Sequence, residues 1–236
     1  PAQSAGAQRK ALDEAFANAM RGVHQKYPDD ADAAAIFAES LLDLSPWNYW
    51  QDDGSPRAFT NEAEAALKAA LALNPEHTGA LHYTIHVYER FEPEKAESAA
   101  DRLEVQAPDA GHLVHMPAHI YYRVGRYKDS ADVNEAAAAA DVAYFSWCRA
   151  PAAYAALYYT HNLHFLWASA MIEGRSDAAL TAARRIVAQV PTDQLATFPF
   201  LEDFLVTPLY TQARFGRWDA ILGEPHEFAA RPLSGF

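Results

Sequence analysis

The sequence predicts an all-α protein, an α-solenoid in which antiparallel helix hairpins stack into a right-handed superhelix. Hydrophobic residues make up 50% of the 236-residue chain, and alanine, the residue with the highest helix propensity, is very frequent. Glycine and proline gather at the ends of alanine-rich amphipathic stretches, where they stop helices. These breaks recur along the chain, which is typical of stacked repeats. Few strands are expected.

The repeat interval follows from the prolines that close amphipathic stretches, which are Pro28, Pro75, Pro108 and Pro191. Pro75 and Pro108 are 33 residues apart, close to the period of about 34 residues of tetratricopeptide repeats (TPR), whose units are pairs of antiparallel helices. Glycine-containing turns at 125–127, 174–176 and 216–218 agree with this, since each follows an aromatic-rich helix. The interval therefore predicts a single TPR-like helical-repeat domain over 1–236.

Each predicted helix fills the interval between two breaks. In chain order the predicted helices are 5–26, 30–44, 60–74, 77–91, 94–106, 111–124, 128–145, 152–173, 176–189 and 197–215. Residues 45–59 are rich in proline and aromatic residues and predict an ordered insertion that forms a lid or a wall. Pro117 predicts a helix start or a kink within 111–124, with His112 ahead of the main helix, because proline lacks the backbone donor.

Composition and charge exclude several classes of function. A formal net charge of −12 argues against nucleic acid as a partner, since phosphate binding calls for clustered Lys and Arg. The single cysteine, Cys148, excludes an internal disulfide and a thiolate-rich metal site. The sequence shows neither a membrane span nor a retained signal peptide, so a soluble protein is expected. A chain that starts at Pro1 without Met is expected to be processed or a fragment of a longer repeat protein.

Seven of the ten histidines fall in three groups with helical spacing. The separations of three, four and seven residues place each group's imidazoles on one helix face. Imidazole is the commonest protein ligand for zinc, copper and iron, and an i, i+4 pair can hold one ion from one helix. The groups are His82 and His86 in HYTIH, His112, His115 and His119 in HLVHMPAH, and His161 and His164 in HNLH.

The repeat assignment places all three groups on the first, or A, helices of successive units. In a solenoid of this kind the A helices line the concave groove and neighbouring axes lie roughly 8–10 Å apart, so ligands from adjacent A helices can meet. The expected metal ligands are His82, His86, His115, His119, His161 and His164. Possible additions are His112, the carboxylates of Glu39 or Asp43 and of Glu202 or Asp203, and the tyrosines Tyr83 and Tyr122.

The structural alternative is a polar groove without an ion. Its histidines would hydrogen-bond to Tyr83, Tyr121, Tyr158 and Tyr159. His24, His77 and His226 lie outside the groups and are expected to be structural or exposed, and the five tryptophans are expected to be packing residues.

The chain resembles a family of mostly uncharacterised bacterial TPR proteins. The resemblance is carried by GALHYTIHVYE, HLVHMPAHIYYRVGRY and YYTHNLHFLWASAMIEGR, with HYxIH and HLVHMPxH as its motifs, and covers about 11–185. It implies a helical-repeat fold and longer relatives with further repeats upstream. It also implies a bacterial source, in which either the cytoplasm or the periplasm would be the compartment. The resemblance implies no particular reaction.

Three functions stay open from the sequence. Three histidines with an open position would let zinc activate water for hydrolysis, and two facing HxxxH pairs could hold copper or iron for oxygen chemistry. The third is a scaffold that holds a small molecule, a peptide or a partner protein in the groove without metal or catalysis. No Gly-rich phosphate loop and no nucleophile elbow is present, so no organic cofactor is expected.

Overall fold

The computed structural model describes residues 5–148, 154–191, 195 and 199–223. The described residues form helices and contain no strand, apart from an isolated bridge between Trp50 and Pro56. The all-α prediction is therefore confirmed, whereas the solenoid and the single repeat domain stay predictions. Contacts divide the chain into two compact units, Pro1–Ala107 and Pro108–Phe236, which are described one at a time.

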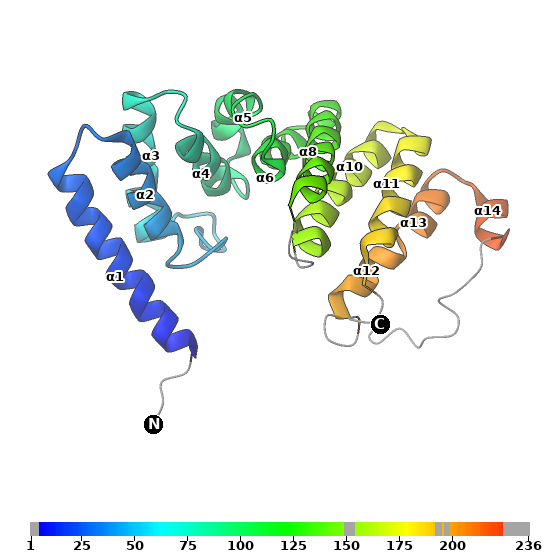
Figure 1. Ribbon diagram of the computed structural model, residues 1–236, viewed down its shortest axis with the longest axis horizontal. Coiled ribbons are helices and arrows are strands. Elements are labelled where there is room, and N and C mark those ends of the chain that lie inside the picture. Colours follow the sequence, from blue (N-terminus) through cyan, green and yellow to red (C-terminus); the bar gives the residue numbers. More distant parts are fainter. Residues whose placement is uncertain (1–4, 149–153, 192–194, 196–198, 224–236) are drawn as a thin grey trace. The chain divides into compact units, whose positions relative to one another are not determined.

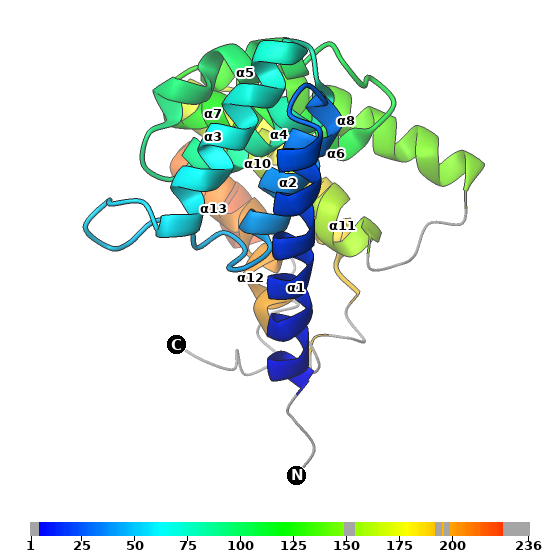
Figure 2. The same cartoon turned by 90° about the vertical axis from the view of Figure 1, so that its left-hand side faces the viewer.

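The first unit consists of helices that pack in chain order, α1 on α2, α2 on α3, α3 on α4 and α4 on α5. Figure 2 shows α2 alongside α1. Asp30 is the N-cap of α2, and its side chain accepts a hydrogen bond from the backbone N–H of Ala33 at 3.0 Å. The elements are α1 (Ala5–Lys26), α2 (Ala31–Leu42), α3 (Ala58–Leu73), α4 (Thr78–Tyr88), η1 (Pro93–Ala96) and α5 (Glu97–Leu103).

Helix α4 is held in place at both ends. His77 caps its first turn by accepting a hydrogen bond from the N–H of Ala80 at 3.1 Å. Near its last turn, the indole N–H of Trp50 donates to the carbonyl of Val87 at 2.7 Å. Leu81 and Ile85 are fully buried. The face of α4 that carries His82 and His86 is therefore fixed relative to its own unit.

Residues 43–57 connect α2 to α3, so the predicted insertion 45–59 extends two residues into α3. The connection contributes two side chains to the core of the first unit. Tyr49 and Trp50 are 7% and 5% exposed. Trp47 instead is 70% exposed and has a positive φ of 58°. The expectation that the tryptophans are packing residues is wrong for Trp47, and also for Trp147 and Trp218, which are 87% and 61% exposed.

The second unit is organised around the long helix α8, which packs against α6, α7 and α10. Helix α10 in turn packs on α11, and α11 on α13. The elements are α6 (Gly111–His115), α7 (Pro117–Arg123), α8 (Tyr127–Trp147), the π-helix η2 (Ala155–Tyr159), α10 (Thr160–Glu173), α11 (Ser176–Gln189), η4 (Pro199–Leu201), α12 (Glu202–Leu205), α13 (Thr207–Arg214) and α14 (Trp218–Gly223).

The breaks occur where the sequence places glycine and proline. Gly125 and Gly174, after α7 and α10, have left-handed φ values of 86° and 77°, which glycine adopts without the strain of a Cβ. Predicted helix 111–124 divides into α6 and α7 at Pro117, as expected. The predicted helix 197–215 is instead three short elements, η4, α12 and α13, and α14 was not predicted. Residues 152–153 and 197–198, which begin two of the predicted helices, lie outside the described residues.

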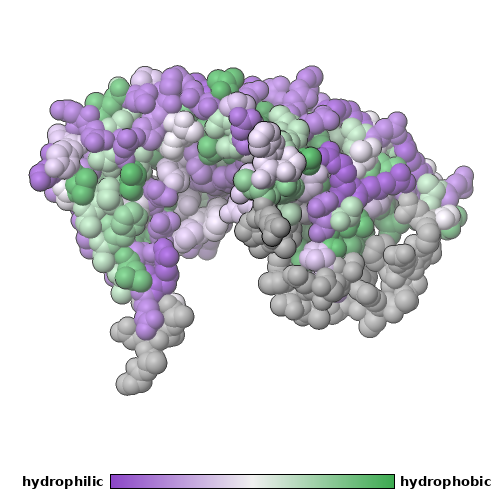
Figure 3. All heavy atoms as spheres, viewed as in Figure 1, coloured by the Kyte–Doolittle hydropathy of each residue, from purple (hydrophilic) through white to green (hydrophobic). Residues whose placement is uncertain are grey.

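None of the helices in the described part of the chain is long and apolar enough to cross a membrane. Exposed apolar side chains do lie along α1, at the left of Figure 3, and include Leu12, Phe16 and Val23.

Candidate metal centre

The Pro117 break keeps His115 and His119 on one face. Met116, between α6 and α7, retains helical dihedral angles, with φ −53° and ψ −38°. The chain therefore continues in a helical path although Pro117 supplies no N–H. One turn apart on this path, the Nε2 atoms of His115 and His119 lie 2.9 Å from each other.

His161 of α10 joins this pair. One ring nitrogen from each of His115, His119 and His161 lies within 4.8 Å of the other two. The ring centroid of His161 is 4.7 Å from that of His115 and 5.6 Å from that of His119. Phe165, one turn along α10, packs against all three rings with centroid distances of 4.7–5.0 Å. We call these three histidines the three-histidine centre.

Asn134 of α8 fixes the tautomer of His115. The amide of Asn134 donates through Nδ2 to the carbonyl of Ser130 at 2.6 Å, so its oxygen faces His115. His115 donates its Nδ1–H to that oxygen at 2.6 Å. A neutral imidazole has one N–H, so Nε2 of His115 carries a lone pair toward His119. Metal-binding histidines are commonly oriented by such a partner on the second nitrogen.

Burial keeps His115 neutral. The side chain is fully buried, and this burial, together with the neighbouring His119 and His161, lowers the pKa of His115 well below its ordinary value. A metal ion binds neutral imidazole, so this ligand has no proton to lose near neutral pH.

The spacing of the ligand atoms suits a metal ion. Two nitrogens bound to one tetrahedral zinc at about 2.0–2.1 Å lie about 3.3 Å apart. The His115 and His119 nitrogens, at 2.9 Å, need to separate by only a few tenths of an ångström. No carboxylate belongs to this group within the described residues, so the ligand set is three imidazoles.

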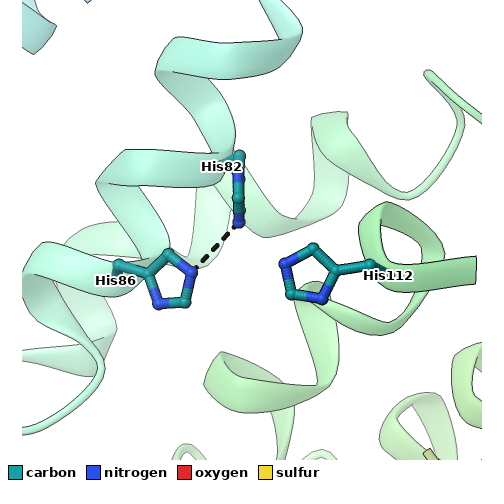
Figure 4. Close-up of side chains that lie close together, drawn as sticks. All are labelled: His82, His86 and His112. Carbon is teal, nitrogen blue, oxygen red and sulfur yellow. Dashed lines mark hydrogen bonds between the residues drawn. The ribbon is translucent and has the colours of Figure 1, made fainter. Parts of the chain in front are cut away.

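The first unit holds a separate pair of facing imidazoles. His82 and His86 on α4 have their Nε2 atoms 3.0 Å apart (Figure 4). The Nδ1 of His86 lies 3.2 Å from a carboxylate oxygen of Glu89. Figure 4 also labels His112, which belongs to the second unit.

The remaining predicted histidines have aromatic neighbours within the second unit. His112 of α6 lies edge-on to Tyr158, with ring centroids 5.4 Å apart, and 6.4 Å from the ring of His115. His164 stacks on Trp167 at 5.2 Å and contacts Phe204 of α12. Burial lowers the pKa of His164, but this histidine is not part of the three-histidine centre.

The predicted carboxylates and tyrosines lie outside the three-histidine centre. In the first unit, Tyr83 stacks on His82, and burial together with a hydrogen bond to Glu39 raises the pKa of Tyr83. In the second unit, Glu202 and Asp203 lie on α12, and Asp203 is exposed. Tyr122 contacts Phe165 at 5.9 Å, and burial raises its pKa.

In the alternative of a polar groove without an ion, four tyrosines are expected to hydrogen-bond to the histidines. Two of these tyrosines have other partners. Tyr121 lies beneath the guanidinium of Arg126, and Tyr159 accepts a hydrogen bond from Arg185 at 3.1 Å. Tyr83 and Tyr158 do contact histidine rings, those of His82 and His112.

Sequence reasoning missed the residues that support the imidazoles. Asn134 lies just before the alanine run of α8, where Ser130 and Asp141 are also buried polar residues, and Phe165 lies one turn after His161. The i, i+4 spacing of His161 and Phe165 is the signal that the sequence offered. The carboxylate of Asp141 was also missed. It is buried against Gly111 and accepts hydrogen bonds from Tyr154 at 2.9 Å and Asn162 at 2.8 Å. This network joins α6, α8 and α10 next to two of the histidines.

Comparison with known proteins found no match that bears on these histidines. No model of a protein family matches the chain, and no curated protein matches it.

Proposed function

We propose that this chain is a TPR-like helical-repeat protein whose second unit binds a transition-metal ion at His115, His119 and His161. The observation that carries the proposal is the arrangement around His115, whose Nε2 faces His119 while Asn134 holds the other nitrogen. An arrangement with an outer hydrogen-bond partner is what a metal-binding imidazole needs.

Three imidazole ligands leave a coordination position for water or substrate. This is the ligand pattern of catalytic zinc, which lowers the pKa of bound water to about 7. Copper and iron also accept imidazole ligands, so the ligand set alone supports hydrolytic and oxygen-dependent chemistry. Phe165 packs against all three rings and His115 is fully buried, so one side of the centre is shielded from water, whereas His119 and His161 are partly exposed.

The test is metal content per chain, measured by inductively coupled plasma mass spectrometry on protein purified without chelator or His-tag. Replacing His115 and His119 together with Ala is expected to remove the equivalent of metal held by the second unit and to leave the helical content unchanged. His164→Ala is the matched control, because His164 lies on the same helix as His161 but packs on Trp167. Retention of that metal in the double variant would overturn the proposal.

A scaffold without metal is the second candidate, and one observation favours it. The first unit has a cavity of about 350 Å³ between α3, α4 and α5, with Lys68, Lys95 and Arg102 in its wall. Such cations suit an anionic ligand, although each is already paired with a carboxylate of this chain. A peptide or anion that binds equally well with and without metal would support this candidate.

A further inference from the structure

Helix α4 repeats, within the first unit, the arrangement found around His115. In both places two histidines four residues apart face each other through Nε2, at 3.0 Å for His82 and His86 and 2.9 Å for His115 and His119. In both places one histidine of the pair also has a hydrogen-bond acceptor on Nδ1. The two pairs lie in different units and on different helices.

Glu89 has the role for His86 that Asn134 has for His115. A carboxylate only accepts, so the Nδ1–H of His86 donates to Glu89 at 3.2 Å, and Nε2 of His86 carries the lone pair toward His82. The side chains of His86 and Glu89 are each 14% exposed, so this contact is largely shielded from water. A carboxylate behind an imidazole makes the imidazole a stronger donor to a metal.

The pair is held by the fold of its own unit. The His77 cap and the hydrogen bond from Trp50 to Val87 fix the two ends of α4, and Leu81 and Ile85 are buried on its other faces. Tyr83 stacks on His82 and donates to Glu39 of α2. Because α4, the ring of His82 and the carboxylate of Glu89 are already held in place, little side-chain entropy is lost when an ion binds.

The surroundings of the pair are anionic. The carboxylates of Glu39 and Asp43 repel each other, and both act on Tyr83, whose ring stacks on His82. Glu89 adds a further negative charge. A divalent cation would reduce this repulsion, whereas the three-histidine centre has a neutral amide in the corresponding position.

We propose that His82 and His86, with Glu89 behind His86, form a second metal site in the first unit that takes an exchangeable divalent transition-metal ion such as Zn²⁺ or Cu²⁺. The two imidazoles supply two ligands, and water fills the remaining positions. The site is independent of the three-histidine centre and is expected to bind more weakly, because it offers fewer protein ligands.

The experiment isolates the pair in the full-length His115→Ala/His119→Ala protein. Zinc is titrated into this background and followed by competition with a chromophoric chelator. One equivalent is expected to bind, and adding His82→Ala and His86→Ala is expected to abolish that equivalent. Circular dichroism checks that each variant keeps its helical content.

Glu89→Gln in the same background separates a built site from a chance pair of surface histidines. This change keeps an acceptor but removes the charge, and it is expected to weaken zinc binding about 10-fold, the lower end of the range for losing such a partner altogether. Glu92→Gln is the matched control, since Glu92 lies three residues away and pairs with Lys95 at 2.8 Å. An equal effect of the two changes, or none from Glu89→Gln, would overturn the assignment of Glu89.

The outcomes distinguish this site from the three-histidine centre. Wild-type protein that binds one equivalent, with none left in the His115→Ala/His119→Ala background, would overturn the second site and leave the three-histidine centre standing. If all binding is instead lost with His82→Ala/His86→Ala alone, the three-histidine proposal fails and the site on α4 stands.

Discussion

Asn134 is the residue whose contacts bear most directly on the three-histidine centre. It touches His115 but is not a metal ligand itself, so its effect acts through the orientation of the ring. Asn134→Ala removes the acceptor and frees both the tautomer and the rotation of His115. Zinc affinity is expected to fall about 10–100-fold, the usual effect of losing such a partner, measured by competition titration.

Two further variants make this test specific. Asn134→Asp restores an acceptor and is expected to recover most of the affinity. Ser169→Ala removes a buried hydroxyl at the same α8–α10 contact, where Ser169 pairs with Ser130 at 2.9 Å, without touching His115. Equal losses in Asn134→Ala and Ser169→Ala would point to a general packing effect.

Asp141 predicts a pH dependence of stability. Burial raises the pKa of Asp141 above its unfolded value, against the opposing effect of hydrogen bonds from Tyr154 and Asn162. A carboxyl with a raised folded pKa stabilises the fold fully below the unfolded pKa of about 3.9 and loses this contribution as pH rises through the folded pKa. The free energy of unfolding of the wild type, relative to Asp141→Asn, is therefore expected to fall as pH rises above about 4.

Urea unfolding of both proteins at several pH values between 4 and 7 measures this difference. If the difference in free energy of unfolding between the two proteins stays constant or grows with pH, Asp141 ionises in the folded protein at least as readily as in the unfolded chain, which would contradict the prediction.

At the scale of elements, the close approach of α6 and α8 depends on Gly111. A Cβ at this position would overlap the carboxylate of Asp141, which is held from the other side by Tyr154 and Asn162. Gly111→Ala is expected to lower the free energy of unfolding by about 3 kcal/mol, the upper part of the usual range for overpacking. Gly22→Ala in α1, where nothing lies within 4 Å of the added Cβ, is the control and is expected to be neutral or stabilising.

Helices were the part of the structure most readily predicted from sequence, because glycine and proline act locally. Gly125, Gly174 and Pro117 each end or begin a helix where the sequence places them. Which imidazoles meet was harder to predict. His161 and His164 are three residues apart, which leaves them about 60° apart around a helix. That angle directs His164 to Trp167 and Phe204, and spacing alone does not reveal the rotation of α10 against α6.

The supporting residues escaped prediction for a related reason. Asn134 and Asp141 lie on α8, a helix without histidines. Their partners are distant in sequence, since His115 is 19 residues from Asn134 and Asn162 is 21 residues from Asp141. A polar residue in an alanine-rich helix can face water or a neighbouring helix, and only the packing of α8 decides between the two.

At the scale of the whole molecule, metal binding and stability are linked. An ion that binds only the folded chain raises its free energy of unfolding by about 2.7 kcal/mol when the free ion is at 100 times its dissociation constant. Zinc is therefore expected to raise the melting temperature of the wild type. The shift is expected to shrink in His115→Ala/His119→Ala and to remain in His164→Ala, as followed by circular dichroism at 222 nm.

Binding of one ion by three imidazoles of the second unit can be observed directly. The most direct measurement is X-ray absorption fine structure of the His82→Ala/His86→Ala protein loaded with one equivalent of zinc, so that only the three-histidine centre contributes. About three imidazole nitrogens are expected at about 2.0–2.1 Å, with a water oxygen completing the shell. A shell of oxygens with no imidazole scattering would contradict binding of the ion at this centre.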